Sequence, residues 1–434
     1  MSQVRSDSIE SRSSASAQSS PLPVSTAWFV AIAATLTMSV SYVDRQALAA
    51  LAPSVTEQLH ISDAAYGWLQ SAFSIAYLIG TPLAGMWIDR AGARRGLIGS
   101  MLVWTAVASL HSAVPGFMSL FALRIVLGFA ESPGFPGAAQ SVQRILPPAH
   151  RSAGFGVLFT GSSIGAAIAP PLAVALQNHF HSWRVAFMLT ALVGMSWLPI
   201  WFAATRDRRV QAILDRAEEP SGRGPRVPIL PLLRDPAVLR AVVLVICSAP
   251  LIGFVLLWAA KYLRAVFHVP QSEVGHYLWL PPLCFDIGSI VFGAIATHRD
   301  REDRAAGQGR RQHTMLVVLG TLIFTVGVAI PWAATVWTMV AIAGVSLVGG
   351  GALYALLTAD MLARVPAHVV STAGGLTAAA QSLAYIIANI ALGAVVQRTH
   401  SYASTAIALS VLALPGALFW LTRKVSEPPP SALV

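Results

Sequence analysis

The sequence predicts an all-α membrane protein in which twelve transmembrane helices form two pseudo-symmetric six-helix bundles. Three observations lead to this fold class: the scarcity of charge, the spacing of apolar runs, and a motif repeated in the two halves. Of the 434 residues, 55% are hydrophobic and 11% are charged, whereas an ordinary soluble domain has about 25% charged residues. So few charges could not cover the surface of a soluble enzyme of this length, and that class of protein is excluded.

Twelve apolar runs are long enough to cross a membrane, because a helix needs about 20 apolar residues to span the hydrocarbon core. Pro331 is the reason for separating the ninth run from the tenth. The runs lie at 27–50, 65–88, 97–115, 117–141, 153–176, 185–205, 238–262, 273–297, 314–331, 333–360, 372–395 and 403–421. The chain then divides into a serine-rich tail predicted to be disordered (1–25), a first bundle (26–205), a cytoplasmic linker (206–237), a second bundle (238–424) and a second tail (425–434).

The distribution of basic residues predicts the topology. The net charge of +10 comes from Lys and Arg in the short segments between apolar runs. If the N-terminus is cytoplasmic, these residues fall in cytoplasmic segments, with six exceptions: Arg45, Arg124, Arg184, Lys261, Arg264 and Arg398. This bias follows the positive-inside rule, so we expect a multi-pass inner-membrane protein with both termini in the cytoplasm. Nucleic acid is not expected as a partner, because no basic helix or aromatic-studded basic patch occurs.

A short motif repeats halfway along the chain. PAHRSAGFGVLFTGSS begins at Pro148, and PAHVVSTAGGLTAAAQS begins at Pro366. Both follow an even-numbered run at equivalent places in the two halves. The repeat indicates a duplicated six-helix unit, as in transporters built from parallel halves.

The loop after the second run carries a family motif. It reads GMWIDRAGARR and matches the pattern G-x-x-x-D-R-x-G-x-R-R at every specified position, through Gly85, Asp89, Arg90, Gly92, Arg94 and Arg95. This pattern resembles the signature of the major facilitator superfamily. The resemblance implies the major facilitator fold and a secondary transporter, with these residues forming a conformational loop on the cytoplasmic face.

Longer stretches resemble one branch of that superfamily. SYVDRQAL, RIVLGFAESPGFP and GSSIGAAIAPPLAVAL are similar to the anion:cation symporter family. WAAKYLRAVF and YLWLPPLCFDIGS resemble its hexuronate-transporter branch. The resemblance implies import of a sugar acid together with protons. Ser41 and Ser163 stand where relatives often carry asparagine, so another organic anion (an aldonate, aldarate, tartrate or aromatic acid) stays open as the substrate.

Four ionisable residues fall inside the first and fourth predicted spans: Asp44, Arg45, Arg124 and Glu131. Charged groups at membrane depth are costly and are functional candidates by default. Arg124 and Glu131 are seven residues apart and share a helix face, whereas the adjacent Asp44 and Arg45 point about 100° apart. Guanidinium groups suit the binding of a substrate carboxylate, and the matching family positions imply that Glu131 carries the proton with help from Asp44. The alternative is a structural ion-pair network between helices.

Further polar residues are weaker candidates. As substrate contacts we consider Tyr77, Trp258, Lys261, Gln381, Ser382 and Asn389, and as possible additions Tyr42, Ser162, Tyr262 and Asp286. Aromatic residues also populate membrane interfaces, lysines snorkel and amides bond neighbouring helices, so each has a structural alternative. Asp286 is a lone acid in the middle of its span, where it could serve substrate, proton or helix packing.

Enzyme motifs are absent or misplaced in this sequence. Residues 161–165, GSSIG, match the hydrolase pattern G-x-S-x-G, but that motif needs a strand-to-helix turn and here lies within an apolar run. No phosphate-binding G-x-x-x-x-G-K-[ST] loop and no H-E-x-x-H metal motif occurs. We therefore expect a monomeric symporter with no cofactor or metal, driven by the proton gradient, whose partners are a small carboxylated substrate, protons and the lipid bilayer. A non-transporting membrane sensor is the alternative from another class.

Overall fold

The protein is described by a computed structural model that covers residues 22–216, 229–305, 313–366, 369–423 and 425. Within these ranges the secondary structure is helical, and no strand occurs. Twelve helical segments are long and apolar enough to cross a membrane. They are Val24–Gln58, Asp63–Ala91, Ala93–Ala113, Phe117–Ile145, Ala153–Phe180, Trp183–Ala204, Pro236–Leu257, Gly275–Asp303, Thr314–Trp332, Val336–Arg364, Thr372–Thr399 and Ala403–Thr422. The predicted fold class is confirmed. Most of the tails and residues 217–228 of the predicted linker lie outside the described residues.

The N-terminal half contains eight α-helices and one short 3₁₀ turn in the described residues up to Ala204. They are α2 (Val24–Gln58), α3 (Asp63–Ala91), α4 (Ala93–Leu110), η1 (His111–Ala113), α5 (Phe117–Glu131), α6 (Gly134–Ile145), α7 (Pro148–Phe180), α8 (Trp183–Met195) and α9 (Trp197–Ala204). Two short helices follow, α10 (Arg208–Leu214) and α11 (Ile229–Arg234).

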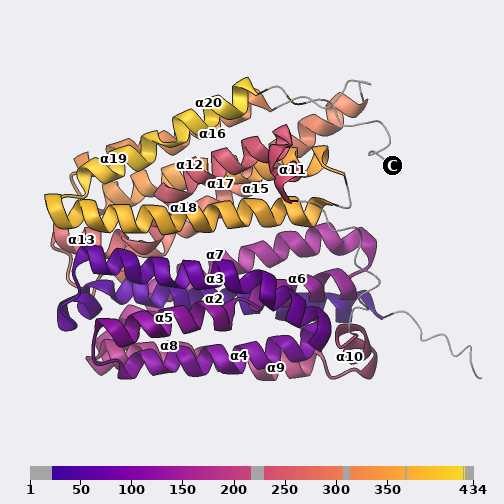
Figure 1. The fold of residues 1–434 in the computed structure, drawn as a ribbon, viewed down its shortest axis with the longest axis horizontal. Helices are drawn as coiled ribbons and strands as arrows, with labels where there is room; N and C mark the ends of the chain where they lie inside the picture. The colour runs from indigo at the N-terminus through magenta and orange to yellow at the C-terminus, as the bar shows by residue number, and fades with distance from the viewer. Residues whose placement is uncertain (1–21, 217–228, 306–312, 367–368, 424, 426–434) are drawn as a thin grey trace, which may run out of the picture.

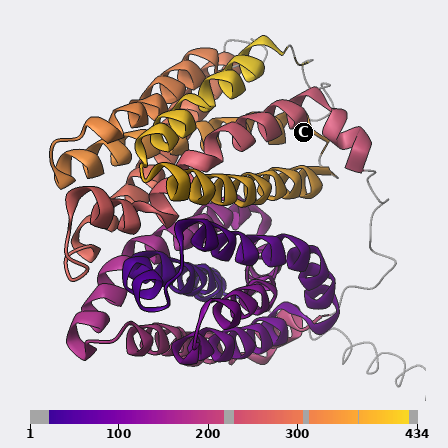
Figure 2. The same ribbon diagram turned by 60° about the vertical axis from the view of Figure 1, so that its left-hand side comes forward.

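The C-terminal half repeats this arrangement. Its helices are α12 (Pro236–Leu257), α13 (Ala259–Phe267), α14 (Gly275–Leu278), α15 (Leu280–Ala305), α16 (Thr314–Thr325), η3 (Val326–Trp332), α17 (Val336–Arg364), α18 (Val370–Thr399), α19 (Ala403–Val411) and α20 (Ala413–Thr422). Figure 1 shows the two halves stacked with their long helices running in the same general direction, and Figure 2 shows them still separate after a 60° turn.

Both ends of the described chain lie on the same side of the molecule. The start of α2, the end of α20 and the short helices α10 and α11 gather at the right-hand end of Figure 1. We call this the linker end and the opposite one the far end. An even number of crossings requires this placement, so the structure and the charge distribution agree on it.

Several spans are divided into shorter helices, and two of these breaks lie close to the candidate residues. The fourth divides into α5 and α6 next to Pro133, which lacks the N–H that helix continuation needs. The seventh was predicted to run to residue 262 but ends at Leu257, and α13 begins as a separate helix after Trp258. The Leu257 carbonyl accepts a hydrogen bond from the Tyr66 hydroxyl of α3 at 2.7 Å. A contact between the halves thus lies at the break.

The apolar core joins the halves at the far end. One buried cluster, including Trp104, Trp197 and Trp201, belongs to the N-terminal half. The other combines Leu48, Leu51 and Tyr66 of the N-terminal half with Phe254 and Trp258 of the C-terminal half. Because this second cluster is continuous across the halves, apolar burial holds them together there.

Polar contacts reinforce the far end. Asp63 at the start of α3 receives Lys261 Nζ at 2.7 Å, and its backbone N–H donates to Gln397 of α18 at 3.0 Å. Gln271 donates to the Ala50 carbonyl at 2.9 Å. These bonds link residues far apart in the sequence, so the molecule is closed between its halves at this end.

Candidate functional site

Four charges meet near the middle of the N-terminal half, and we call Asp44, Arg45, Arg124 and Glu131 the charge cluster. Three of them are buried, and the Arg45 side chain is 16% exposed. Arg45 donates from Nε to Oε2 of Glu131 at 2.9 Å. Ser41, one turn earlier on α2, donates to the same oxygen at 2.8 Å. Glu131 is 1% exposed, and its second oxygen, Oε1, has no hydrogen-bond partner among the described residues. This buried carboxylate is therefore satisfied on one side.

Aromatic rings enclose the Arg45 guanidinium. Its central carbon lies 4.3 Å from the ring centre of Tyr77, 4.7 Å from that of Phe73 and 5.1 Å from that of Tyr42. Ring faces attract cations at such distances, so they hold the guanidinium in place. Arg45 Nη2 is buried and finds no acceptor in the described part of the chain. The Arg45–Glu131 pair thus keeps one charged donor and one carboxylate oxygen without a partner.

Arg124 is tied to a different partner. Its Nη2 donates to Gln70 Oε1 at 3.2 Å, and Gln70 Nε2 donates to the Tyr66 hydroxyl at 2.6 Å. Tyr66 in turn donates to Leu257, so this chain of hydrogen bonds runs from Arg124 to the other half. Arg124 is 1% exposed, and its Nε and Nη1 lack acceptors within the described ranges. A buried cation with two unused donors has room for an anionic partner.

Asp44 points away from Arg45, as their adjacency on α2 predicts. It is 3% exposed, and its Oδ2 has no hydrogen-bond partner among the residues described. Trp104 of α4 lies beside it. Asp44 is therefore a buried carboxyl group with one unpartnered oxygen.

The halves approach each other next to the cluster. Tyr42 lies near Ser162 of α7, and near Tyr354 and Tyr385 of the C-terminal half. Gln381 donates to the Tyr385 hydroxyl at 3.1 Å. A small cavity between the halves is lined by Gln46, Ala50, Ala166, Pro170, Val255, Leu256, Leu278 and Pro282. The Arg45 neighbourhood therefore opens onto the interface between the bundles.

Three candidates from the second half lie at the far end instead. Trp258 donates from its indole to Asn389 Oδ1 at 2.8 Å, and its ring meets the Tyr66 ring edge-on at 4.8 Å. Lys261 pairs with Asp63 and lies 5.0 Å from the Tyr66 ring centre. These residues close the molecule at that end, although Asn389 keeps an unpartnered amide nitrogen in the described chain.

Two weaker candidates serve local structure. Tyr262 is 2% exposed and donates to the Ile330 carbonyl at 3.3 Å within the C-terminal half. Ser382 donates to the Ala378 carbonyl of its own helix at 3.1 Å. Neither geometry favours the substrate contact that the sequence suggested. Asp286 differs, because its Oδ1 accepts a hydrogen bond from Ser163 of the other half at 2.7 Å.

Sequence reasoning missed Gln70 and Phe73. Both lie on α3 with Tyr77, at a spacing of three and then four residues, which places all three on one helix face. Gln70 binds Arg124, while Phe73 lies against both arginines, 4.8 Å from the central carbon of Arg124. Their helical spacing from the candidate Tyr77 is the feature of the sequence that could have identified them.

Comparisons with known proteins agree with this architecture. A model described as Major Facilitator Superfamily matches residues 34–389. The chain belongs to the major facilitator superfamily. It is thus a multi-pass membrane transporter and not an enzyme, as the loop motif predicted.

Relatives and solved structures extend the comparison. A hexuronate transporter of Bacillus subtilis is 27% identical over 385 residues, covering 86% of this chain and 89% of the relative. A hexuronate transporter of Escherichia coli K12 is 26% identical over 419 residues, covering 92% and 94%. The crystal structure of a bacterial homologue of the human lysosomal transporter Spinster, inward-facing and unoccupied, has a TM-score of 0.75 at 16% identity, covering 92% of this chain and 97% of that chain.

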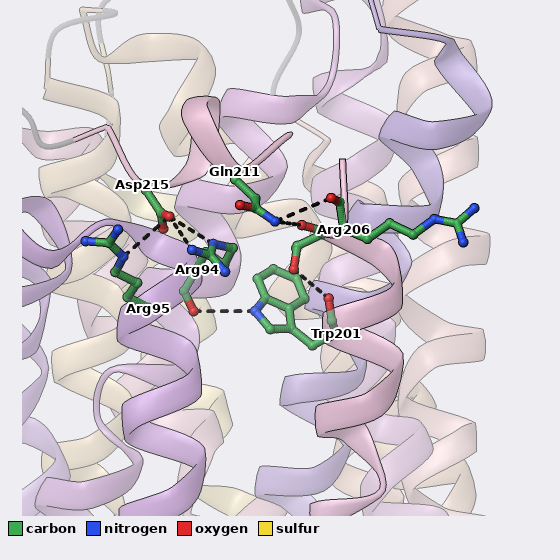
Figure 3. Close-up of polar contacts among 7 residues, drawn as sticks. Arg94, Arg95, Trp201, Arg206, Gln211 and Asp215 are labelled. Atoms are coloured by element: carbon green, nitrogen blue, oxygen red, sulfur yellow. Dashed lines mark hydrogen bonds and ion pairs between the residues drawn. The ribbon is translucent and has the colours of Figure 1, made fainter. Parts of the chain in front are cut away.

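In this major facilitator chain the signature loop holds α10 in place (Figure 3). Arg94 donates from Nη2 and Nε to Asp215 Oδ2 at 2.6 and 2.9 Å, and Arg95 Nε lies 3.5 Å from the same oxygen. Gly92 adopts φ +81°, and a Cβ there would lie 2.6 Å from the Asp215 Cα. Only glycine tolerates this backbone and this close approach. Residues 208–215, predicted as linker, therefore pack on the N-terminal half.

The remaining signature residues and the start of α10 are also accounted for locally. Asp89 accepts a hydrogen bond from Gln140 of α6 at 3.0 Å, while the Arg90 side chain is exposed. Asp207 caps α10 by accepting from the Arg209 backbone N–H at 2.8 Å. The Arg209 side chain, bonded to the same carboxylate, lowers the pKa of Asp207 below its usual range. This carboxylate therefore stays ionised as a cap.

Proposed function

We propose that the protein is a proton-coupled symporter that imports a small organic anion, a hexuronate such as glucuronate or galacturonate, across the inner membrane. One observation carries the proposal: Glu131 is buried, Arg45 is largely so, and both Arg45 Nη2 and Glu131 Oε1 lack a partner in the described chain. Few buried polar atoms in proteins lack a partner, so those that do call for an explanation. Here the two unpartnered atoms are a donor suited to a carboxylate and an acceptor suited to a proton.

The pairing suggests how proton and substrate are coupled. A substrate carboxylate binds Arg45 in the two-pronged geometry that a guanidinium favours. To do so fully it must displace Glu131 from Nε, and a protonated Glu131 releases that donor readily. Proton uptake on Glu131 and substrate binding on Arg45 therefore favour each other.

Charge balance leads to the same coupling. Arg45, Arg124, ionised Asp44 and ionised Glu131 together carry no net charge. A monoanionic substrate bound to the charge cluster leaves it with one negative charge, which is costly in a low-dielectric interior. One proton on Glu131 or Asp44 restores neutrality, and the neutral, loaded carrier changes orientation more easily than the charged one.

Alternating access fits the observed closure. With both termini in the cytoplasm, the linker end faces inward and the far end, closed by Lys261 and Asp63, faces outward. The state described is then closed to the outside. No cofactor is invoked, since the proton gradient supplies the energy.

The substrate class rests on the arginines and the polar groups opposite them. Tyr354, Tyr385 and Gln381 supply hydroxyl and amide groups suited to a sugar, while the hexuronate relatives favour a uronic acid. An aldonate, an aldarate, tartrate or an aromatic acid would use the same carboxylate contact. A non-transporting sensor would bind the acid without accumulating it.

Reconstituted vesicles test the proposal. Wild-type protein in proteoliposomes with an imposed pH gradient should accumulate labelled glucuronate. Glu131→Gln should abolish that accumulation while exchange of internal for external substrate continues, because the neutral amide cannot carry a proton. Glu302→Gln, the same substitution at a largely exposed acid, should behave as wild type. Intact gradient-driven accumulation by Glu131→Gln would overturn the assignment, and a panel of labelled acids would identify the substrate.

A further inference from the structure

Asp286 is an acid outside the charge cluster, on the opposite bundle. It lies in α15, and its Oδ1 accepts a hydrogen bond from the Ser163 hydroxyl of α7 at 2.7 Å, across the interface between the halves. No ion pair is found for it among the residues described. Its side chain is partly exposed, unlike the nearly inaccessible Glu131 and Asp44. Asp286 is thus a carboxylate in the middle of a span, without a cationic partner in the described residues and with a partly exposed side chain. Helix packing alone does not explain such a group.

Neighbouring residues place Asp286 across the interface from Arg45. Pro282, one helical turn before it, lines the small cavity between the halves. Gln46, which follows Arg45 on α2, and Ala166, three residues after Ser163 on α7, line the same cavity. α2, α7 and α15 therefore converge at this cavity, and Asp286 lies one helical turn beyond the part of α15 that lines it.

A second path links the two sides. The Tyr42 ring lies 5.1 Å from the central carbon of Arg45, and Tyr42 also lies near Ser162. Ser163, the next residue, holds Asp286. α7 is thus approached by Tyr42, which packs on Arg45, and by Asp286 at the next residue.

We propose that Asp286 sets the charge selectivity of the carrier, accepting monocarboxylic sugar acids and rejecting dicarboxylic ones. The inference rests on the proposed function, since it assumes that Arg45 binds the substrate carboxylate. A hydroxyl at the far end of the substrate donates to the Asp286 carboxylate. A second substrate carboxylate has no proton to donate and is repelled by the like charge. Asp286 thus works by excluding the wrong partner as well as by binding the right one.

Glucuronate and glucarate form a matched pair for the test, because glucarate carries a second carboxylate at the opposite end of the same carbon chain. Inhibition of labelled glucuronate exchange by each unlabelled acid gives a selectivity ratio in proteoliposomes. Wild-type protein should favour glucuronate. Asp286→Asn should shift the ratio toward glucarate by about tenfold, the factor that corresponds to roughly 1.4 kcal/mol of repulsion.

Two further variants separate the effect of the charge from other effects of the substitution. Ser163→Ala removes the hydrogen bond but leaves the charge, and Asp286→Glu keeps the charge on a longer side chain, so both should retain the wild-type preference. An unchanged ratio in Asp286→Asn overturns the inference. So does a variant that exchanges glucuronate normally but loses gradient-driven accumulation, since Asp286 would then be a proton carrier. If wild-type protein transports no sugar acid, the proposed function itself fails, which is a separate result.

Discussion

At the residue scale, the position of Arg45 makes three demands on its side chain, and arginine meets all of them. Its Nε holds Glu131, its face lies against Tyr77, and its Nη2 is left without an acceptor in the described chain. A planar group with several fixed donors can do all three, whereas an ammonium group is a compact point charge. The identity of this cation therefore matters beyond its sign.

We expect Arg45→Lys to raise the KM for the transported anion about tenfold or more, the loss that follows when a two-pronged charged contact becomes a single one. Initial uptake rates measured against substrate concentration give this value. Arg264→Lys, at a site that is 45% exposed, is the matched control and should leave the KM unchanged. Equal KM values for Arg45→Lys and wild type would remove Arg45 from the binding site.

The sequence predicted individual charged residues better than their partners. The sequence identified Asp44, Arg45, Arg124 and Glu131, because charged residues are rare at membrane depth. It did not reveal that Glu131 bonds Arg45 and that Arg124 bonds Gln70. Those choices depend on how α3 and α5 are rotated against α2, which packing sets.

At the scale of elements, α3 and α18 pack closely because glycines remove side chains between them. A Cβ on Gly67 would lie 2.2 Å from the Asn389 carbonyl oxygen, and one on Gly393 would lie 2.5 Å from the Asp63 carbonyl oxygen. Both obstacles are backbone atoms, so a side-chain adjustment cannot relieve the clash. Closure of the far end requires these helices to meet at these positions.

Gly67→Ala should therefore shift the carrier toward states that are open at the far end. Ala50 is 1% exposed in the closed molecule, so a cysteine placed there reports opening. In intact cells, Ala50→Cys should react several-fold faster with a membrane-impermeant maleimide when combined with Gly67→Ala.

Gly156→Ala is the control for this experiment, since an added Cβ at Gly156 meets nothing within 4 Å. It should leave the labelling rate of the cysteine unchanged. Equal labelling in the Gly67→Ala and Gly156→Ala backgrounds would show that the clash does not limit closure.

The sequence predicted the spans more reliably than their internal breaks. Apolar length alone located the twelve segments. The end of α12 at Leu257 was missed, because its cause is a contact with Tyr66 that comes from another helix. The short α10 was assigned to a linker for a similar reason: the ion pair with Arg94 that holds it is tertiary.

At the scale of the whole molecule, the ion pair between Lys261 and Asp63 connects the two halves where they are closed. The side chains are 11% and 27% exposed, and a pair that is partly shielded from water is worth more than a free surface pair. If the two halves form this ion pair in only one relative orientation, the ion pair stabilises that orientation. Transport requires this bond to break and re-form.

Reversing one charge should slow uptake, and reversing both should restore much of the rate. Asp63→Lys places two cations together, and so favours separation of the halves. Adding Lys261→Asp recreates an attractive pair in the opposite sense. Uptake rates for the wild type, the two single variants and the double variant form a double-mutant cycle. Strictly additive effects would mean that the pair does not couple the halves.

By itself the sequence determined the membrane class, the number of spans and the superfamily, because each depends on local composition or on a contiguous motif. The tertiary structure decided which buried charges pair, which end of the molecule is closed, and which candidates face the interface between the bundles. Those outcomes follow from the rotation and approach of helices that are distant in the chain. Lys261 and Asp286 illustrate the difference: both stood out as polar residues in apolar surroundings, yet packing placed one in an ion pair at the far end and the other against Ser163 between the bundles.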